Sequence, residues 1–129
     1  EAQLLYVLNR TQYEPQLKEK LAQGIHIIAE DYIGTGMAWG IGAGVDEPFM
    51  TQINSHLLKE DMAFLFTGKR FMEATEADHQ HETNEELMKT VEQTHEQLGK
   101  THGWIPISAN QPQEQIHELL WQHLQPTLA

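Results

Sequence analysis

Residues 28–44 read IAEDYIGTGMAWGIGAG, and this stretch decides how the chain is organised. The apolar run at 25–29 that leads into it is typical of a strand covered on both faces, as in parallel sheets. Two carboxylates, Glu30 and Asp31, end the predicted strand, and five glycines follow. The glycines predict a flexible loop. Carboxylates at the end of a strand, next to such a loop, suit a site for a phosphorylated ligand and its metal ion. The alternative without a binding role is a polar strand end that leads into a flexible connection.

Predicted helices and strands alternate along the rest of the chain. Pro15 predicts a kink or break in the first helix, and Gly24 is placed to cap its C-terminus. Alternation of this kind predicts one α/β domain over 1–129, with a parallel sheet and flanking helices. The predicted helices are 2–23, 46–58, 84–100 and 112–124, and the predicted strands are 25–32, 62–68 and 104–110.

Each long helix shows apolar residues at helical spacing, which predicts the face turned to the core. Asp46 is expected to cap the helix at 46–58, and a short helix is expected within 69–86. The predicted core positions are Leu4, Leu5, Val7, Leu8, Leu17 and Leu21 in the first helix, Leu87, Met88, Val91, His95 and Leu98 in the third, and Ile116, Leu119, Leu120 and Leu124 in the last.

Composition excludes several classes of protein. The chain has 129 residues, 40% hydrophobic content and a net charge of −11, with 19 acidic residues against 8 Lys and Arg. This acidic balance argues against nucleic acid as a partner, because such binding needs clustered basic side chains. No apolar run approaches the ~20 residues that cross a bilayer, and without cysteine there is no disulfide or thiolate metal site. A cytoplasmic location without a membrane partner is the default expectation.

Four blocks in order resemble a known family. They are LYVLNRTQYEPQLKEKLAQGIHIIAEDY at 5–32, EDYIGTGMAW at 30–39, EDMAFLFTG at 60–68 and WIPISANQPQEQIHELL at 104–120. Together they resemble the last two thirds of the thymidylate kinases, whose signature is an apolar strand, Asp-Arg-Tyr, a Ser-Ser or Ser-Asn pair and Tyr. The resemblance implies a nucleoside monophosphate kinase fold with a phosphate-binding loop. It also implies transfer of a phosphoryl group from ATP to dTMP with Mg²⁺, and a homodimer formed partly through the helix at 2–23.

The resemblance assigns roles to positions of this sequence, although each also has a purely structural interpretation. Arg10 matches the arginine that contacts the base, and otherwise it is a solvated helix cation. Trp39 matches the tyrosine that packs on the deoxyribose, and otherwise it is a packing residue. The remaining positions are Glu30 near the metal and phosphates, Tyr32, Thr35 and Gly36 near the substrate, Lys69 and Arg70 as lid cations, and Ala109, Asn110 and Gln111 near the adenine of ATP.

The departures from the family pattern are as informative. Asp31 stands where the family has arginine, which reverses an attraction of ~4 kcal/mol at 4 Å for an effective dielectric constant of 20. No G-x-x-x-x-G-K-[ST] loop is present, so the first strand and the phosphate loop are expected to be missing from this sequence. The sequence is then either an inactive part of a kinase or a non-catalytic nucleotide-binding or interaction module.

Two further expectations concern the strand gap and the histidines. In the family, the phosphate-loop strand lies between the strands matching 25–32 and 62–68. Without it, we expect the two strands to close onto each other, to pair with another chain, or to leave the fold marginal. The block DHQHE at 78–82 leaves a metal-binding histidine protein as a third interpretation, less favoured than a solvated polar loop.

Overall fold

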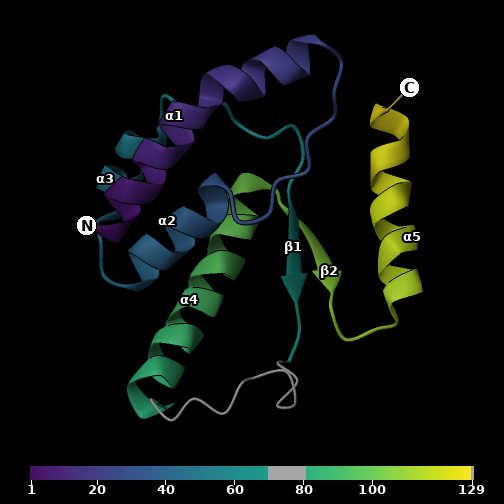
Figure 1. The fold of residues 1–129 in the computed structure, drawn as a ribbon. Coiled ribbons are helices and arrows are strands. Elements are labelled where there is room, and N and C mark those ends of the chain that lie inside the picture. The colour runs from purple at the N-terminus through teal and green to yellow at the C-terminus, as the bar shows by residue number, and fades with distance from the viewer. Residues whose placement is uncertain (70–80, 129) are drawn as a thin grey trace.

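The computed structural model describes residues 1–69 and 81–128 of the chain, as helices around a small sheet (Figure 1). The elements run in the order α1 (Ala2–Ala22), α2 (Ile33–Gly42), α3 (Glu47–Asn54), β1 (Phe64–Thr67), α4 (His81–His102), β2 (Ile105–Ser108), α5 (Gln113–Leu124) and the 3₁₀ turn η2 (Gln125–Thr127).

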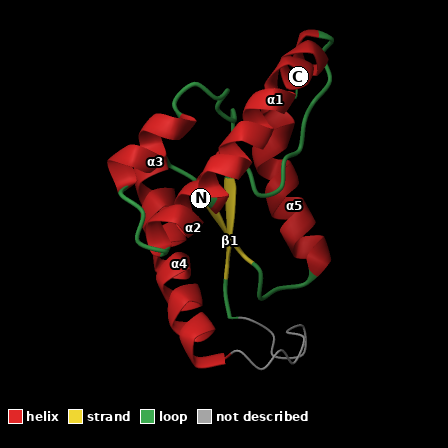
Figure 2. Cartoon of the chain, turned by 60° about the vertical axis from the view of Figure 1, so that its left-hand side comes forward, coloured by secondary structure: helices red, strands yellow, loops and turns green. Residues whose placement is uncertain are grey.

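The sheet has two parallel strands in the described part of the chain. β1 pairs with β2 in a register that places Phe64 opposite Ile105 and Thr67 opposite Ser108. Helices α4 and α5 lie on opposite sides of the strands, as Figures 1 and 2 both show. The structure therefore confirms the strands predicted at 62–68 and 104–110 and the parallel direction of the predicted sheet. Pro106 is tolerated because no described strand pairs with the edge of β2 that faces away from β1, so no backbone donor is needed there.

The prediction of a strand at 25–32 is wrong, because the structure has no strand between α1 and α2. Residues 21–31 are all exposed, and Ile28 keeps 96% of its surface accessible. The backbone N–H of Ile25 still bonds to the C=O of Lys20, at the end of α1, but 25–31 pairs with neither β1 nor β2. A strand forms only where a neighbour accepts its backbone hydrogen bonds, and no described segment lies in that place. The closing of this segment onto 62–68 is likewise wrong.

The glycine loop predicted after Asp31 is instead mostly the helix α2. Its glycines mark places where other elements approach its backbone too closely for a side chain. A Cβ on Gly34 would lie 2.5 Å from the Trp104 ring, and one on Gly42 would lie 2.8 Å from Cγ2 of Val91. Packing against α4 and the start of β2 therefore outweighs the low helix propensity of glycine.

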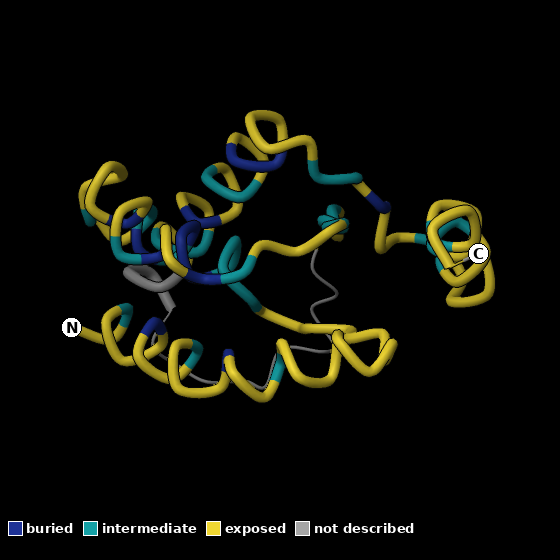
Figure 3. Tube along the Cα trace, turned by 90° about the horizontal axis from the view of Figure 1, so that it is seen from above, coloured by how far each residue is buried: buried dark blue, intermediate teal, exposed yellow. Residues whose placement is uncertain are grey.

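The core lies between α2, α3 and α4 rather than across the whole sheet. Met37, Ala38, Met50 and Leu98 are buried together, and the half-buried Trp104 packs against them. Figure 3 shows buried positions on these helices and also on α1 and β2, while α5 carries only intermediate and exposed positions. The stripe predicted for α5 (Ile116, Leu119, Leu120 and Leu124) is its half-buried face.

Helix α1 forms where it was predicted, but most of its apolar residues face outward. Val7 and Glu14 are its buried residues, whereas Leu4, Leu5, Leu8 and Leu21 are 50%, 67%, 54% and 38% exposed. The predicted stripe is therefore wrong for these four leucines and right for Val7 and Leu17. The face that packs against the body repeats through Gln3, Val7, Arg10, Glu14 and Leu17. Pro15 lies inside the helix and does not end it.

The helix ends follow the sequence signals. Gly24 follows α1 with φ +80°, and Asp46 caps α3 by accepting a hydrogen bond from the N–H of Phe49 at 3.2 Å. α4 begins at His81, before the predicted start, and Val91 and Leu98 are buried as expected. The short helix expected after 69 falls largely on 70–80, outside the described residues. None of the described helices has a stretch apolar and long enough to cross a membrane.

Candidate functional site

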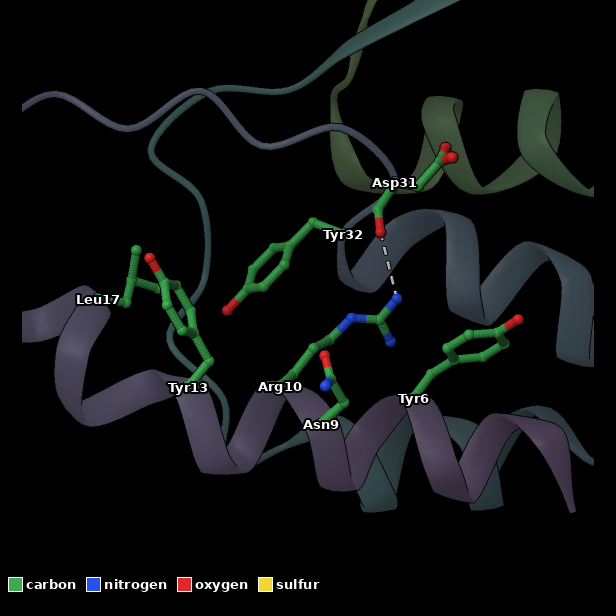
Figure 4. A pocket seen from close by; sticks show the side chains of 7 residues that line it. All are labelled: Tyr6, Asn9, Arg10, Tyr13, Leu17, Asp31 and Tyr32. Carbon is green, nitrogen blue, oxygen red and sulfur yellow. Dashed lines mark hydrogen bonds between the residues drawn. The ribbon is translucent and has the colours of Figure 1, made fainter.

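A hollow of about 260 Å³ opens between α1 and the turn that leads into α2 (Figure 4). Helical spacing brings Tyr6, Arg10, Tyr13 and Leu17 to the same side of α1, because residues three and four apart are neighbours on a helix. Asn9 also comes from α1, and Asp31 and Tyr32 close the hollow from the turn.

Arg10 is the central cation of this hollow. Its Nη2 donates a hydrogen bond to the backbone oxygen of Asp31 at 3.3 Å. Its Cζ lies 6.0 Å from the ring centroid of Tyr6 and 5.9 Å from that of Tyr32, at the outer limit of cation–π attraction. Burial lowers the pKa of Arg10, and the two tyrosines and Asp31 oppose this shift, so the guanidinium stays charged.

Asp31 reaches this position through an unusual backbone conformation. Its φ is +54°, the left-handed region that aspartate tolerates better than most residues. The turn directs the carbonyl of Asp31 at Arg10, while its carboxylate accepts a hydrogen bond from Oγ1 of Thr35 at 3.3 Å. The carboxylate is thus bound to a side chain in the first turn of α2, and Arg10 receives a neutral carbonyl oxygen.

Gly36 allows Arg10 to approach α2 closely. A Cβ on Gly36 would lie 2.9 Å from Nη1 of Arg10 and 3.3 Å from Oε1 of Gln3. Both of these atoms are buried without a hydrogen-bond partner in the described part of the chain. A polar pair of one donor and one acceptor therefore lies against the α2 backbone beneath the hollow.

Tyr32 is held by the segment that follows α3. Its hydroxyl donates to the carbonyl oxygen of Leu58 at 2.9 Å, and Glu14 accepts from the N–H of Leu58. Burial raises the pKa of Tyr32, so the phenol stays protonated and can donate. The hydrogen bond from Leu58 holds the pKa of Glu14 below its usual value, and Lys18 adds to this shift. These two side chains fix both backbone groups of Leu58.

The predicted site residues fall into two places. The hollow brings together Arg10 and Tyr32, and Thr35 and Gly36 adjoin it through Asp31 and Arg10. Trp39 is half-buried on α2 and does not line it, and Glu30 is exposed. Lys69, Ala109, Asn110 and Gln111 lie instead beyond the carboxyl ends of β1 and β2, and Arg70 lies outside the described residues.

Metal-ligating side chains do not gather among those that the structure describes, where no group of three or more His, Asp or Glu could hold an ion. The metal role of Glu30 stays a prediction. In the block 78–82, residues 78–80 lie outside the described residues and the side chains of 81 and 82 outside the described side chains.

Tyr6 and Tyr13 are lining residues that the sequence interpretation missed. Both belong to the helix predicted at 2–23, for which no site role was predicted at these two positions. The available signal was their spacing, because they stand four residues before and three residues after Arg10. A cation between two aromatic residues on one helical face predicts a shared surface.

A small parallel sheet between helices defines the described part of the chain as an α/β fold. The sequence model described as thymidylate kinase matches residues 1–120. The chain belongs to the thymidylate kinase family. This confirms the resemblance found in the sequence blocks.

Individual relatives agree at low identity. The thymidylate kinase of Plasmodium falciparum (isolate 3D7) is 26% identical over 117 residues, which cover 88% of this chain and 56% of the relative. A thymidylate kinase-like protein of Invertebrate iridescent virus 6 is 26% identical over 110 residues, 84% of this chain and 52% of the relative. The chain thus spans about half the length of these curated relatives. No solved structure matches it significantly.

Proposed function

We propose that this chain is part of a nucleoside monophosphate kinase of the thymidylate type, which moves a phosphoryl group from ATP to dTMP. The observation that carries the proposal is Arg10, which lies between Tyr6 and Tyr32 in the hollow of α1. A charged donor beside aromatic rings suits a planar base with carbonyl acceptors. Family membership supports the same choice of ligand.

We assign the roles from the resemblance to the family. Arg10 contacts the base, with Tyr6 and Tyr32 beside it. Thr35 and Gly36, at the start of α2, face the sugar and its phosphate, and Trp39 packs on the sugar side. Lys69 and Arg70 act as cations on the transferred group, while the segment Ala109, Asn110 and Gln111 lies near the adenine of ATP.

Mg²⁺ would be bound mainly by the phosphates of ATP rather than by protein side chains alone. The described side chains offer Glu30 and the neighbouring Asp31, and one or two carboxylates are what Mg²⁺ takes from proteins when phosphates fill its other positions. Glu30, whose exposed side chain no described residue engages by a hydrogen bond, is the residue we assign to this ion.

The test is binding of dTMP to the chain, measured by calorimetric titration and by thermal unfolding. We expect dTMP to raise the melting temperature, because a ligand of the folded state stabilises it. The Arg10→Ala variant should weaken binding on the order of tenfold to a hundredfold, which is the cost of a lost hydrogen bond to a charged group. Lys89→Ala, an exposed cation on α4, is the matched control and should bind as the parent does. Absence of binding by any nucleoside monophosphate would contradict the proposal.

A second candidate is a non-catalytic nucleotide-binding or interaction module on the same scaffold. Asp31 favours it, because a carboxylate that accepts a hydrogen bond from Thr35 stands in the family's arginine position, where a cation would bind phosphate. Incubation of the protein as it occurs in the cell, rather than of residues 1–129 alone, with Mg²⁺, γ-labelled ATP and dTMP separates the two. The kinase yields labelled dTDP and ADP, whereas the module binds nucleotide without forming either product.

The association and location of the protein are part of the proposal. We infer a homodimer that uses the exposed face of α1, where Leu4, Leu5 and Leu8 are each at least half exposed. A cytoplasmic protein that binds neither nucleic acid nor membrane, folded as a single domain over 1–129, is consistent with the net charge of −11.

A further inference from the structure

The loops beyond β1 and β2 are joined by one side chain. Oδ1 of Asn110 accepts a hydrogen bond from the N–H of Lys69 at 2.7 Å, and Nδ2 of Asn110 donates to the C=O of Lys69 at 3.1 Å. A carboxamide that pairs with both backbone groups of one residue takes the place of a neighbouring strand. The pairing continues the ladder, since the N–H of Ala109 donates to the C=O of Thr67 at 2.7 Å.

Gly68 makes this approach possible. Its φ of +140° lies where residues with a side chain are strained, and a Cβ there would lie 2.0 Å from Oδ1 of Asn110. Steric space and backbone conformation therefore both require glycine beside the carboxamide. The contact between Asn110 and Lys69 therefore depends on glycine at position 68 of one loop and on the carboxamide at position 110 of the other.

The loop of Asn110 is fixed independently of Lys69. The N–H of Asn110 donates to Oγ of Ser108 at 3.3 Å, and Nε2 of Gln111 donates to the C=O of Ser108 at 2.7 Å. Asn110 is thus attached to the end of β2, and it transmits that position to Lys69. One donor and one acceptor of its carboxamide are already used by the backbone of Lys69.

We propose that Asn110 is a positioning residue that acts through Lys69, rather than a residue that reads the adenine. By holding the Lys69 backbone at two points, it fixes where the flexible lysine side chain begins, at the edge where parallel sheets bind ligands. The ammonium group can then meet a phosphate of a nucleoside triphosphate at a smaller loss of conformational entropy. The identity of the ligand in this inference rests on the proposed function. The contact between Asn110 and Lys69 does not depend on that function.

The first experiment measures hydrogen exchange at the amide of Lys69 in the full chain. Asn110→Ala should raise the exchange rate about threefold to tenfold, because one hydrogen bond of ordinary net strength is lost. Gln111→Ala is the matched control, since its amide bonds to Ser108 and not to Lys69, and it should leave Lys69 unchanged. Equal exchange rates at Lys69 in the parent and in Asn110→Ala would overturn the contact.

The second experiment is a double-variant cycle on the affinity for Mg²⁺-ATP. Lys69→Ala removes the ammonium group but keeps the backbone that Asn110 binds. If Asn110 acts through Lys69, Asn110→Ala weakens ATP binding in the parent and has no further effect in the Lys69→Ala variant. Additive losses would show that Asn110 contacts the nucleotide itself, and would overturn the positioning role.

The two experiments separate failure of this inference from failure of the proposed function. If the parent binds no ATP while Asn110→Ala still accelerates exchange at Lys69, the proposed ligand of this edge is wrong and the contact stands, whereas the kinase assignment is tested separately by the binding of dTMP. If ATP binds but Lys69 exchanges equally in both proteins, the kinase assignment survives and the positioning role fails.

Discussion

Glu14 shows how one buried carboxylate fixes the segment behind the hollow. It accepts from the N–H of Leu58 and lies 3.5 Å from Nζ of Lys18. The hydrogen bond lowers its pKa in the folded state. Because the folded pKa is depressed, the stabilisation is fully present above the unfolded value of ~4.3, and it is lost as pH falls through the folded value.

The prediction at this scale concerns Glu14→Gln. The variant should unfold at lower urea concentration than the parent at pH 7, and the difference should shrink as pH falls below about 4. Urea unfolding of both proteins at pH 7 and pH 3 measures it. The exposed Glu19→Gln change on the same helix removes an equal charge and should show no such difference. If the stability difference between the parent and Glu14→Gln is equal at both pH values, the hydrogen bond to the ionised carboxylate is not its cause.

At the scale of elements, α2 depends on close approach more than on propensity. Gly42→Ala should raise helix propensity by about 1 kcal/mol. Its Cβ would however meet Cγ2 of Val91 at 2.8 Å and the Val91 Cα at 3.1 Å. Overpacking of this kind costs about 1–3 kcal/mol, so we expect net destabilisation in a denaturant melt.

A cycle with Val91→Ala checks the cause. That change removes Cγ2, so the double variant should be more stable than the sum of the two single losses predicts. Strict additivity would mean that Gly42 and Val91 do not crowd each other, and a stabilised Gly42→Ala would show that propensity decides the helix.

Local signals predicted most elements of this fold, because they act within a few residues. The cap at Asp46, the turn at Gly24 and the strands 64–67 and 105–108 were all readable from the sequence. The failures are non-local. The isoleucines at 25–28 have strand composition but no neighbour, and the glycines of α2 signal contact with α4 rather than a loop.

The features of the candidate site likewise divide into those that local sequence predicts and those that it does not. Arg10 and Tyr32 were identified through the family blocks, and they meet in the hollow. Tyr13 needed only helical spacing and was overlooked. The contact of Asn110 with Lys69 joins residues 41 positions apart, so no local pattern could have predicted it.

The whole molecule combines an acidic charge with apolar surface that the described part of the chain leaves exposed. The leucines at 4, 5 and 8 face outward on α1, and the net charge is −11. Burying a leucine is worth about 1.5–3 kcal/mol, while like charges on two copies repel over roughly 10 Å at 0.1 M salt. Association through α1 should therefore tighten as salt is raised.

The prediction is a dimer that Leu5→Glu with Leu8→Glu dissociates. Loss of two buried leucines should weaken association by on the order of a hundredfold or more. Sedimentation velocity over a concentration series, at low and at high salt, measures it. Gln12→Glu adds the same kind of charge to an exposed polar position of α1 and should stay dimeric. A parent that sediments as a monomer at every concentration would exclude this surface as an interface. A dimer that weakens with salt would instead place charged pairs, and not the leucines, at its centre.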